Sequence, residues 1–231
     1  MDGHAWGRTV VVAAADLVLG SVCAGCACSA GLLCPVCRDE LETPARLLER
    51  RPAGLSVMAT GVYGGTVRSL VLAHKEGGRL AMCRPLGDAL AAAVNALLDS
   101  SACRHEHQAA ALVPAPSARA STRRRGHDPL LRIARRAGAV VRQTGRDCTV
   151  VPAMRHSRRV ADQAGLGQVA RLANLNESMT IRRGAAALLA GSCVVIVDDV
   201  MTTGATIGEV ARVLRTANVE PCGAAVIANA P

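Results

Sequence analysis

The feature that most constrains the fold is the segment V-V-I-V-D-D-V-M-T-T-G-A-T, which runs from Val194 to Thr206. It contains most of an apolar, largely β-branched run over 192–197, and such a run is typical of a central parallel strand buried on both faces. Beyond it, apolar residues recur at helical spacing: Ile207, Val210, Ala211 and Leu214. The pattern predicts a strand over 192–197, then a loop, then a helix that opens near Thr206 and packs back on the sheet.

Strand-like and helix-like segments alternate along the rest of the chain. Further strands are predicted over 55–62, 110–113, 148–151 and 224–228, and helices over 10–20, 66–74, 80–98 and 130–142, with a helix or linker over 39–52. Such alternation is typical of βαβ units and a parallel sheet flanked by helices, which is the α/β class. Half of the residues are apolar, with one Trp, one Tyr and no Phe. The core is therefore expected to consist mainly of Ala, Val and Leu.

Two closely spaced cysteine pairs near the N-terminus indicate a metal site. Cys23 and Cys26 form one C-x-x-C turn, and Cys34 and Cys37 form a second. Each turn presents two thiolates, so the two turns complete a tetrahedral site, for which zinc is the expected metal. Four protein ligands leave no open position, so the zinc is expected to be structural. Cys28 lies in the loop and could compete as a ligand, but its C-x-C spacing from Cys26 makes a ligand role unexpected.

These features predict two parts in the chain. Residues 1–50 would form an N-terminal helix and the zinc-binding segment, here called the four-cysteine module, and residues 51–231 would form the α/β domain. The chain has no apolar stretch of transmembrane length, and the run 10–19 contains Asp16 and lacks a suitable cleavage site. We therefore expect a cytoplasmic protein that does not insert into a membrane.

The paired acids and the Thr/Gly loop place two chemical demands on one ligand. Residues 202–206 offer backbone N–H groups, hydroxyls and a helix N-terminus, which suit a phosphate group. Asp198 and Asp199 are repelled by phosphate and by each other, so they require a neighbouring group that donates hydrogen bonds. A ribose 5-phosphate with free 2- and 3-hydroxyls meets both demands, and Mg²⁺ on an adjacent pyrophosphate would relieve the repulsion further.

The same residues resemble a known motif. The segment from Val194 to Thr206 is similar, over its whole length, to the phosphoribosyl-pyrophosphate (PRPP) binding motif of type I phosphoribosyltransferases. The order of several other segments resembles the ComF family, a phosphoribosyltransferase-like family named for DNA-uptake competence. These segments are the two cysteine pairs, G-V-Y-G-G-T-V-R (61–68), A-H-K-E-G-G-R (73–79), L-V-P-A-P (112–116), R-R-R-G-H-D-P (123–129), A-D-Q-A-G-L (161–166) and R-L-A-N-L (171–175).

The resemblance implies a role for each matching position. Asp198 and Asp199 would hold the ribose diol, and Lys75, the only lysine of the chain, would approach the pyrophosphate; these three are the candidate catalytic residues. The rest of the motif would line the PRPP site: Val200, Met201, Thr202, Thr203, Gly204, Ala205 and Thr206. Arg125 would belong to a flexible loop that covers the site. Gln163 matches a family segment, but no physical role is assigned to it.

The sequence leaves more than one function open. One reading is an enzyme that binds PRPP with Mg²⁺ and transfers the phosphoribosyl group to an unknown nitrogen acceptor. Another is a non-catalytic protein that binds PRPP, a nucleotide or DNA and acts in DNA uptake or recombination. The formal net charge of +9 would favour the binding of such anionic partners. A third is a scaffold with a vestigial site. Thr202 occupies the position where purine-salvage transferases carry a base-binding carboxylate, so purine salvage is not supported. His74 is expected to be a partly buried surface residue, and a homodimer is possible.

Overall fold

The central element of this computed structural model is a six-stranded sheet with the order β1-β2-β8-β7-β3-β4. The described residues are 22–100, 109–117, 122, 125–157 and 179–230. The strands are β1 (Arg46–Leu47), β2 (Val57–Val62), β8 (Pro221–Asn229), β7 (Cys193–Met201), β3 (Ala110–Pro114) and β4 (Cys148–Val150). Only β1 is antiparallel to its neighbour, and the other pairs are parallel. The predicted α/β class with a parallel sheet is therefore confirmed.

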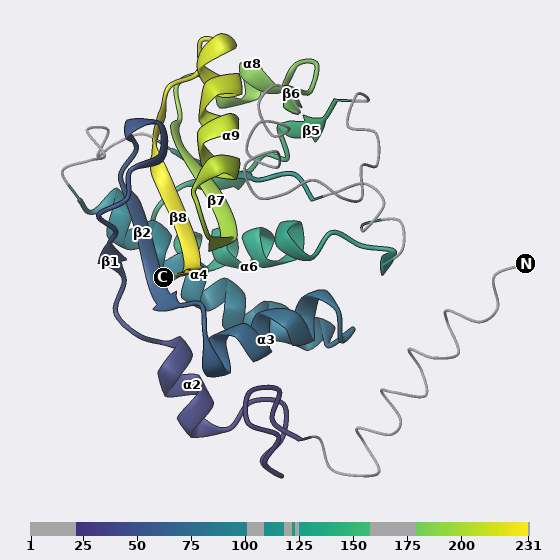
Figure 1. The fold of residues 1–231 in the computed structure, drawn as a ribbon. Coiled ribbons are helices and arrows are strands. Elements are labelled where there is room, and N and C mark those ends of the chain that lie inside the picture. The colour runs from purple at the N-terminus through teal and green to yellow at the C-terminus, as the bar shows by residue number, and fades with distance from the viewer. Residues whose placement is uncertain (1–21, 101–108, 118–121, 123–124, 158–178, 231) are drawn as a thin grey trace, which may run out of the picture.

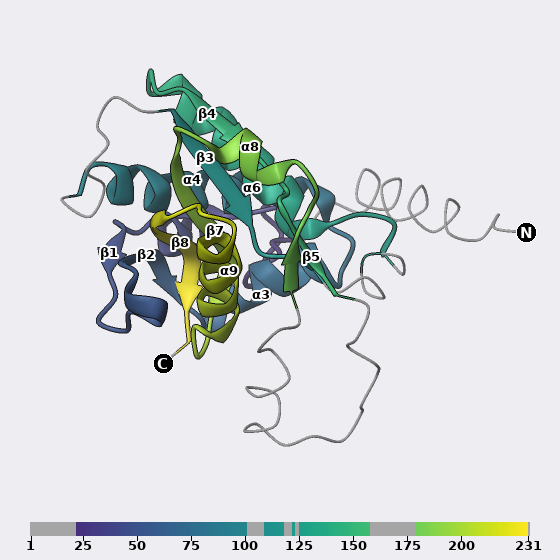
Figure 2. The ribbon, with the colours of Figure 1, turned by 90° about the horizontal axis from the view of Figure 1, so that it is seen from above.

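Helices cover both faces of this sheet (Figure 1). One face packs against α3 (Gly65–Lys75), α4 (Cys83–Leu98) and α6 (Pro129–Gln143), and the other against α9 (Ala205–Thr216) and the short α8 (Ala185–Leu189). Figure 2 shows α9 lying along β7 and β8 when the molecule is seen from above. Among the described residues, no helix has the length and apolar character needed to cross a membrane.

The central strand β7 explains why two helical layers are needed. Its side chains alternate between the faces, so Val195 and Val197 pack with the α4 and α6 layer, whereas Val194 and Ile196 pack with the α9 layer. All four side chains are buried. A strand buried on both faces is what the unbroken β-branched run predicts, and the structure confirms it.

The cysteine-bearing loops of the four-cysteine module and its short helix, α2 (Pro35–Leu41), lie below α3 in Figure 1. The chain then passes through β1 and a 3₁₀ turn, η1 (Pro52–Gly54), before it enters β2. Leu41 on α2 belongs to the same buried cluster as Leu86 and Leu90 of α4. The module is thus packed on the α/β core through apolar side chains.

Several elements differ from the sequence expectations. The strand predicted over 192–197 continues to Met201, because β8 runs beside it and pairs Val200 with Ala228 and Met201 with Asn229. The segment 39–52, predicted as a helix or linker, contains the end of α2 and the two-residue strand β1. The helix predicted over 80–98 begins with a 3₁₀ turn, η2 (Leu80–Met82). The antiparallel pair β5 (Met154–His156) and β6 (Met179–Ile181) was not predicted, nor was α8. The helix predicted over 10–20 lies outside the described residues.

Candidate functional site

The two adjacent acids lie at the carboxyl end of the sheet. Asp198 and Asp199 are both residues of β7, and the backbone N–H of Asp199 donates to Oδ1 of Asp198 over 2.9 Å. On the neighbouring strand, the chain leaves the sheet after Pro114, and the N–H of Ala115 still bonds to the carbonyl oxygen of Val197 at 2.9 Å. This edge is where open α/β sheets bind their ligands.

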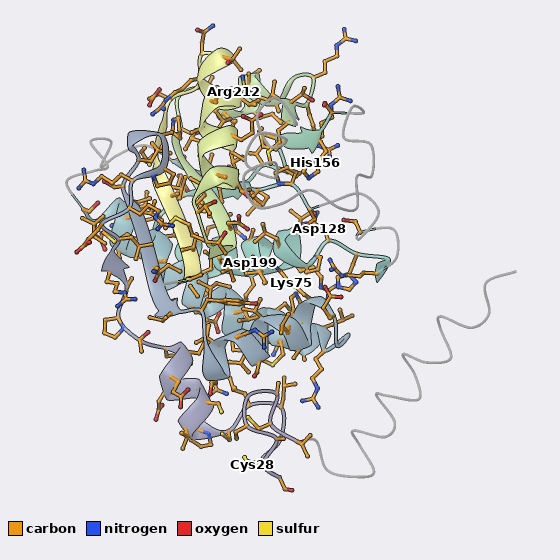
Figure 3. All side chains as sticks on the ribbon, viewed as in Figure 1. Cys28, Lys75, Asp128, His156, Asp199 and Arg212 are labelled. Carbon is orange, nitrogen blue, oxygen red and sulfur yellow. The ribbon has the colours of Figure 1, made fainter. Side chains whose placement is uncertain are left out.

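A lysine from a different layer neutralises one of these acids. Lys75 is the last residue of α3, and its Nζ lies 2.6 Å from Oδ2 of Asp199. Figure 3 shows the two residues side by side next to the end of β7. The Asp199 side chain is only 6 % exposed, against 31 % for Lys75. Burial alone would lower the pKa of Lys75, but the Asp199 carboxylate outweighs this effect and raises it. The ammonium group therefore stays charged and compensates the buried carboxylate.

The second acid has no such cation in direct contact among the described residues. Burial, followed by the repulsion from Asp199, raises the pKa of Asp198 from its ordinary value of 3.8 to about 8. Asp198 is thus protonated at neutral pH in the free protein. A ligand that donates hydrogen bonds, or a divalent cation, would favour the ionised form. The acid pair is arranged for such a ligand, since Lys75 contacts only Asp199 and leaves Asp198 without a cation in direct contact among the described residues.

The segment Thr202–Thr206, here called the phosphate loop, connects β7 to α9. Gly204 caps the helix with a φ of +80°, a left-handed conformation that favours glycine. Thr202 and Thr203 are exposed, and the Oγ1 of Thr203 accepts from the N–H of Ala205 at 3.3 Å. The loop thus presents hydroxyl groups and the N-terminus of a helix of 12 residues at the same edge of the sheet as the acids.

The segment between β1 and β2 holds this loop from outside. The Arg50 guanidinium donates to the carbonyl oxygen of Thr202 at 2.5 Å. A Cβ on Gly204 would lie 2.9 Å from Cβ of Pro52, so Pro52 packs directly against the glycine. Arg215 of α9 donates to the carbonyl oxygen of Ala53 at 3.0 Å. Sequence reasoning missed these contacts, because nothing in the residues around Pro52 indicates a partner that lies so far along the chain.

The loop that carries Arg125 meets the loop that follows α3. Arg125 Nη2 lies 2.5 Å from Oε1 of Glu76, the residue after Lys75. Arg125 is therefore tied to the residue that follows Lys75, and its charge is directed at a carboxylate. The other arginines of the predicted cluster, 123 and 124, lie outside the described residues. The same is true of Gln163 and of the segments 161–166 and 171–175.

His74 differs from the expectation of a partly buried surface residue. Its side chain is completely buried, with Nδ1 3.4 Å from the carbonyl oxygen of Arg79 and Nε2 3.3 Å from that of Pro129. Burial lowers its pKa more than these carbonyl contacts raise it. The ring joins α3 to the start of α6. The residue is enclosed because the helical pattern of α3 turns position 74 towards the core together with Leu70 and Val71.

A cavity of about 380 Å³ lies at the carboxyl end of β3, the strand next to β7, and neither acid belongs to its lining. Its walls come from the segment after β3, the start of α6 and the β5–β6 pair, and include Ser117, Asp128, Arg155, His156 and Arg182. Asp128 caps α6 by accepting from the N–H of Leu131 at 3.1 Å, and it also accepts from the Ser117 hydroxyl at 2.9 Å. His156 Nε2 lies 3.0 Å from the carbonyl oxygen of Pro116. Sequence reasoning missed this cavity, since its lining comes from three separate segments.

The four predicted metal ligands converge in the four-cysteine module. The Sγ atoms of Cys23, Cys26, Cys34 and Cys37 all lie within 4.8 Å of one another, and those of Cys26 and Cys34 are 3.7 Å apart. A tetrahedral zinc site with Zn–S bonds of about 2.3 Å needs sulfur–sulfur distances of about 3.8 Å. Cys28 is exposed and does not belong to this group. The four thiols can therefore hold one metal ion, and zinc suits the donor set.

The surroundings of the sulfur atoms fit thiolate ligands. The N–H groups of Gly25 and Cys34 donate to the sulfur of Cys23 at 3.4 and 3.3 Å. Burial would raise the pKa of Cys23, but these backbone donors lower it to about 6, whereas burial raises the pKa of Cys37 to about 12. A cation at the centre of the group would favour the thiolate form of Cys37, which burial opposes. A Cβ on Gly25 would lie 2.6 Å from the Cys37 sulfur, so the turn requires glycine there.

The raised pKa of Asp198 makes stability depend on pH in a defined direction. Between pH 4 and 8 the folded state holds a proton on Asp198 that the unfolded chain has released, since the pKa is raised from 3.8 to about 8. The free energy of unfolding should therefore fall as the pH rises through this window. Asp198→Asn cannot titrate, and we expect it to lose less stability than the wild type over the same window in urea denaturation. Equal losses in the two proteins would contradict the protonated state of Asp198.

Loss of one metal ligand should remove the metal and destabilise the module, because a site of this kind supplies much of the folding energy of a small metal-binding segment. We expect Cys34→Ser to lower the zinc content per chain, measured by plasma mass spectrometry, from about one to near zero. Cys28→Ser is the matched control, since Cys28 lies in the same loop outside the group of four, and it should retain the metal. An unchanged metal content in Cys34→Ser would show that the ligand set is wrong.

Comparison with known proteins bears on the C-terminal part of the chain. Residues 133–231 match the family model of the phosphoribosyl transferase domain. The matched region contains β7 with the acid pair, the phosphate loop, α9 and β8. No curated protein shows significant sequence similarity to the chain. The match supports a type I phosphoribosyltransferase domain, in agreement with the resemblance carried by the acid pair and the phosphate loop.

Proposed function

We propose that the protein binds PRPP together with Mg²⁺ and transfers its phosphoribosyl group to a nitrogen atom of a small acceptor. The main support for this proposal is that groups suited to a ribose diol and groups suited to a phosphate lie at the same edge of the sheet. The acid pair on β7 and the phosphate loop are separated by two residues, and the same region matches the phosphoribosyl transferase domain model.

Each part of the site has a role in binding. The backbone N–H groups and the hydroxyls of Thr202, Thr203 and Thr206 would hold the 5-phosphate at the N-terminus of α9. Asp198 and Asp199 would accept hydrogen bonds from the ribose 2- and 3-hydroxyls. The bound ribose would stabilise the ionised form of Asp198, whose pKa is raised in the free protein. Mg²⁺, when bound with the pyrophosphate, supplies positive charge that balances the acids and the leaving group.

Lys75 has a more specific place in this proposal than an approach to the pyrophosphate. Its ammonium group is already committed to Asp199 at 2.6 Å. We infer that Lys75 holds the Asp199 carboxylate in place and balances its charge, so that it can accept from the ribose. The flexible ammonium group can also turn towards the pyrophosphate when the ligand enters, because about a third of the side chain is exposed.

The reaction also needs a pocket that binds the acceptor next to the ribose. The bond between C1 of the ribose and the pyrophosphate oxygen would break, pyrophosphate would leave with the electron pair, and a C1–nitrogen bond would form. The protein's contribution is to position the two reactants and to stabilise the positive charge that develops on the ribose. The cavity beside β3 is the candidate acceptor site, because β3 is the neighbour of β7 in the sheet and the cavity opens at the same edge.

The proposal includes membership of the ComF family and the two-part organisation of the chain. The ComF resemblance rests on the order of the sequence segments, and the division into a four-cysteine module over 1–50 and a transferase-like domain over 51–231 is the organisation that this resemblance implies. A protein that binds PRPP without transferring it, as in a DNA-uptake or recombination role, would share the ribose-phosphate site and lack turnover. Binding of DNA and formation of a homodimer have no specific observation in their favour among the described residues.

The proposal predicts a saturable PRPP site that depends on the acid pair. Calorimetric titration with PRPP and Mg²⁺ should show one site in the wild type. In Asp199→Asn the affinity should fall by at least about tenfold, because a neutral amide is a weaker acceptor for the ribose hydroxyls and a charge-assisted bond is lost. Asp147→Asn is the control, since Asp147 is exposed and lies at the opposite end of β4 from this edge.

The results for the two variants distinguish PRPP binding at the acid pair from the alternatives. Binding that is lost in Asp199→Asn and kept in Asp147→Asn supports the site, and release of pyrophosphate on addition of an acceptor would then show transfer. Equal affinity in Asp199→Asn and the wild type would show that the acid pair does not contact the ribose. No binding to the folded, metal-loaded wild type would contradict the proposed function.

A further inference from the structure

A second cavity, of about 560 Å³, lies between the four-cysteine module and the helices α4 and α6. None of the residues that line it belongs to the candidate ribose-phosphate site. Its volume is in the range of roughly 300–1,000 Å³ that is usual for small-molecule sites. We call it the arginine groove, after the residues that line it: Leu32, Leu33, Arg38, Arg84, Asp88 and Arg136, with the first turn of α4.

Three arginines from three different helices line the groove. Arg38 comes from α2, Arg84 from α4 and Arg136 from α6. Arg38 is 3.5 Å from Glu42, and Arg136 is 2.6 Å from Asp88. Arg84 is exposed, and within the described part of the chain it has neither an ion pair nor a side-chain hydrogen bond. The groove therefore holds one cation more than the carboxylates that contact its arginines.

The packing of α4 against α6 fixes the position of Arg136. A side chain on Gly87 would overlap the Cγ of Arg136, and its Cβ would lie 2.6 Å from Cβ of Arg136 and 3.0 Å from the carbonyl oxygen of Ile133. The aliphatic part of Arg136 thus crosses α4 directly over Gly87. Asp88, the next residue, then holds its guanidinium at the groove. A preorganised arginine loses less conformational entropy when it binds an anion.

The remaining lining is apolar. Leu32 and Leu33 are half-buried, and both pack against the main core cluster that includes α4. Pro85 on α4 is buried and lines the same groove. The groove thus joins an apolar floor to a rim of arginines. The planar guanidinium forms paired hydrogen bonds with phosphate oxygens, and a group with several oxygens can contact more than one arginine at once.

We propose that the arginine groove is a binding site for a small phosphate-bearing molecule of the nucleotide class, with its phosphates on Arg84 and Arg136 and its planar base on Leu32 and Leu33. This site is separate from the proposed PRPP site and does not depend on it. Because its walls come from both the four-cysteine module and the core, a bound ligand would hold the two parts together.

The test is a calorimetric titration of the full-length, zinc-loaded protein with ATP, and in parallel with inorganic triphosphate, without added Mg²⁺. We expect saturable binding of ATP that is weakened at least about tenfold in Arg84→Glu, because this change removes a charge-assisted contact and adds a repulsive one. Arg135→Glu is the matched control: it lies on α6, is exposed, does not line the groove and changes the net charge equally. Its affinity should change by less than about threefold.

Two further comparisons locate the ligand. Asp199→Asn should bind ATP as the wild type does, since the groove shares no residue with the acid pair. ATP should bind more tightly than inorganic triphosphate, because only ATP can use the apolar floor. Arg84→Ala provides a second variant without the repulsive charge, and zinc content and melting temperature establish that each variant is folded.

Three results would overturn the proposal. Equal weakening in Arg84→Glu and Arg135→Glu would show that binding follows the net charge of the protein. Loss in Asp199→Asn with no effect of Arg84→Glu would place the nucleotide in the ribose-phosphate site. Absence of binding of both probes to the wild type would show that the groove takes no phosphate-bearing ligand.

Discussion

The ion pair between Lys75 and Asp199 is the interaction on which the arrangement of the site depends. Two neighbouring acids at the end of a buried central strand repel each other, and each is costly to bury without a partner. Lys75 removes this cost for Asp199 from a distance of 2.6 Å, while the pKa of Asp198 is raised to about 8 and the group keeps its proton. The free protein thus holds one balanced carboxylate and one that is ready to ionise when a ligand or cation arrives.

The position of Lys75 is set by structure that lies far from the acids. It is the last residue of α3, and α3 is anchored at both ends. Near its start, Thr66 lies 3.9 Å from the sulfur of Cys37, so the four-cysteine module is packed against it. At its end, the buried His74 contacts the carbonyl oxygens of Arg79 and Pro129. The four-cysteine module therefore supports the site indirectly, because it packs against the helix that carries the compensating charge.

The phosphate loop is held in a similar way, since Arg50, Pro52 and Ala53 contact Thr202, Gly204 and Arg215, respectively. A loop whose backbone is already fixed loses less entropy when it binds a phosphate.

The parts of this structure that could be predicted from the sequence are those with a local signature. The β-branched run before Asp198 identified a central strand, and the spacing of Ile207, Val210 and Leu214 identified α9. The two C-x-x-C turns identified a group of four cysteines that can hold a metal ion. Contacts between distant segments could not be predicted, and the end of β7 at Met201 depends on pairing with β8, which a single strand does not reveal.

In the candidate site, too, local features could be predicted and contacts between distant segments could not. Lys75 could be named as a site residue from the resemblance and from its being the single lysine of the chain, but its contact with the Asp199 carboxylate could not be foreseen. The contacts that Arg50 and Pro52 make with the phosphate loop depend on tertiary packing, and the strands β5 and β6 are too short to show a periodic pattern. The burial of His74 had a local signal, because its helical spacing from Leu70 and Val71 places it on the buried face of α3.

A double-mutant cycle between Lys75 and Asp199 tests the central claim most directly. The free energy of unfolding would be measured by urea denaturation for the wild type, Lys75→Met, Asp199→Asn and the double variant at neutral pH. Because the two side chains form a largely buried ion pair, each single change leaves one charge without its partner, and the double variant should recover part of the loss. We predict a coupling free energy of roughly 1–3 kcal/mol. Strict additivity, within about 0.5 kcal/mol, would contradict the claim that Lys75 stabilises the acid pair.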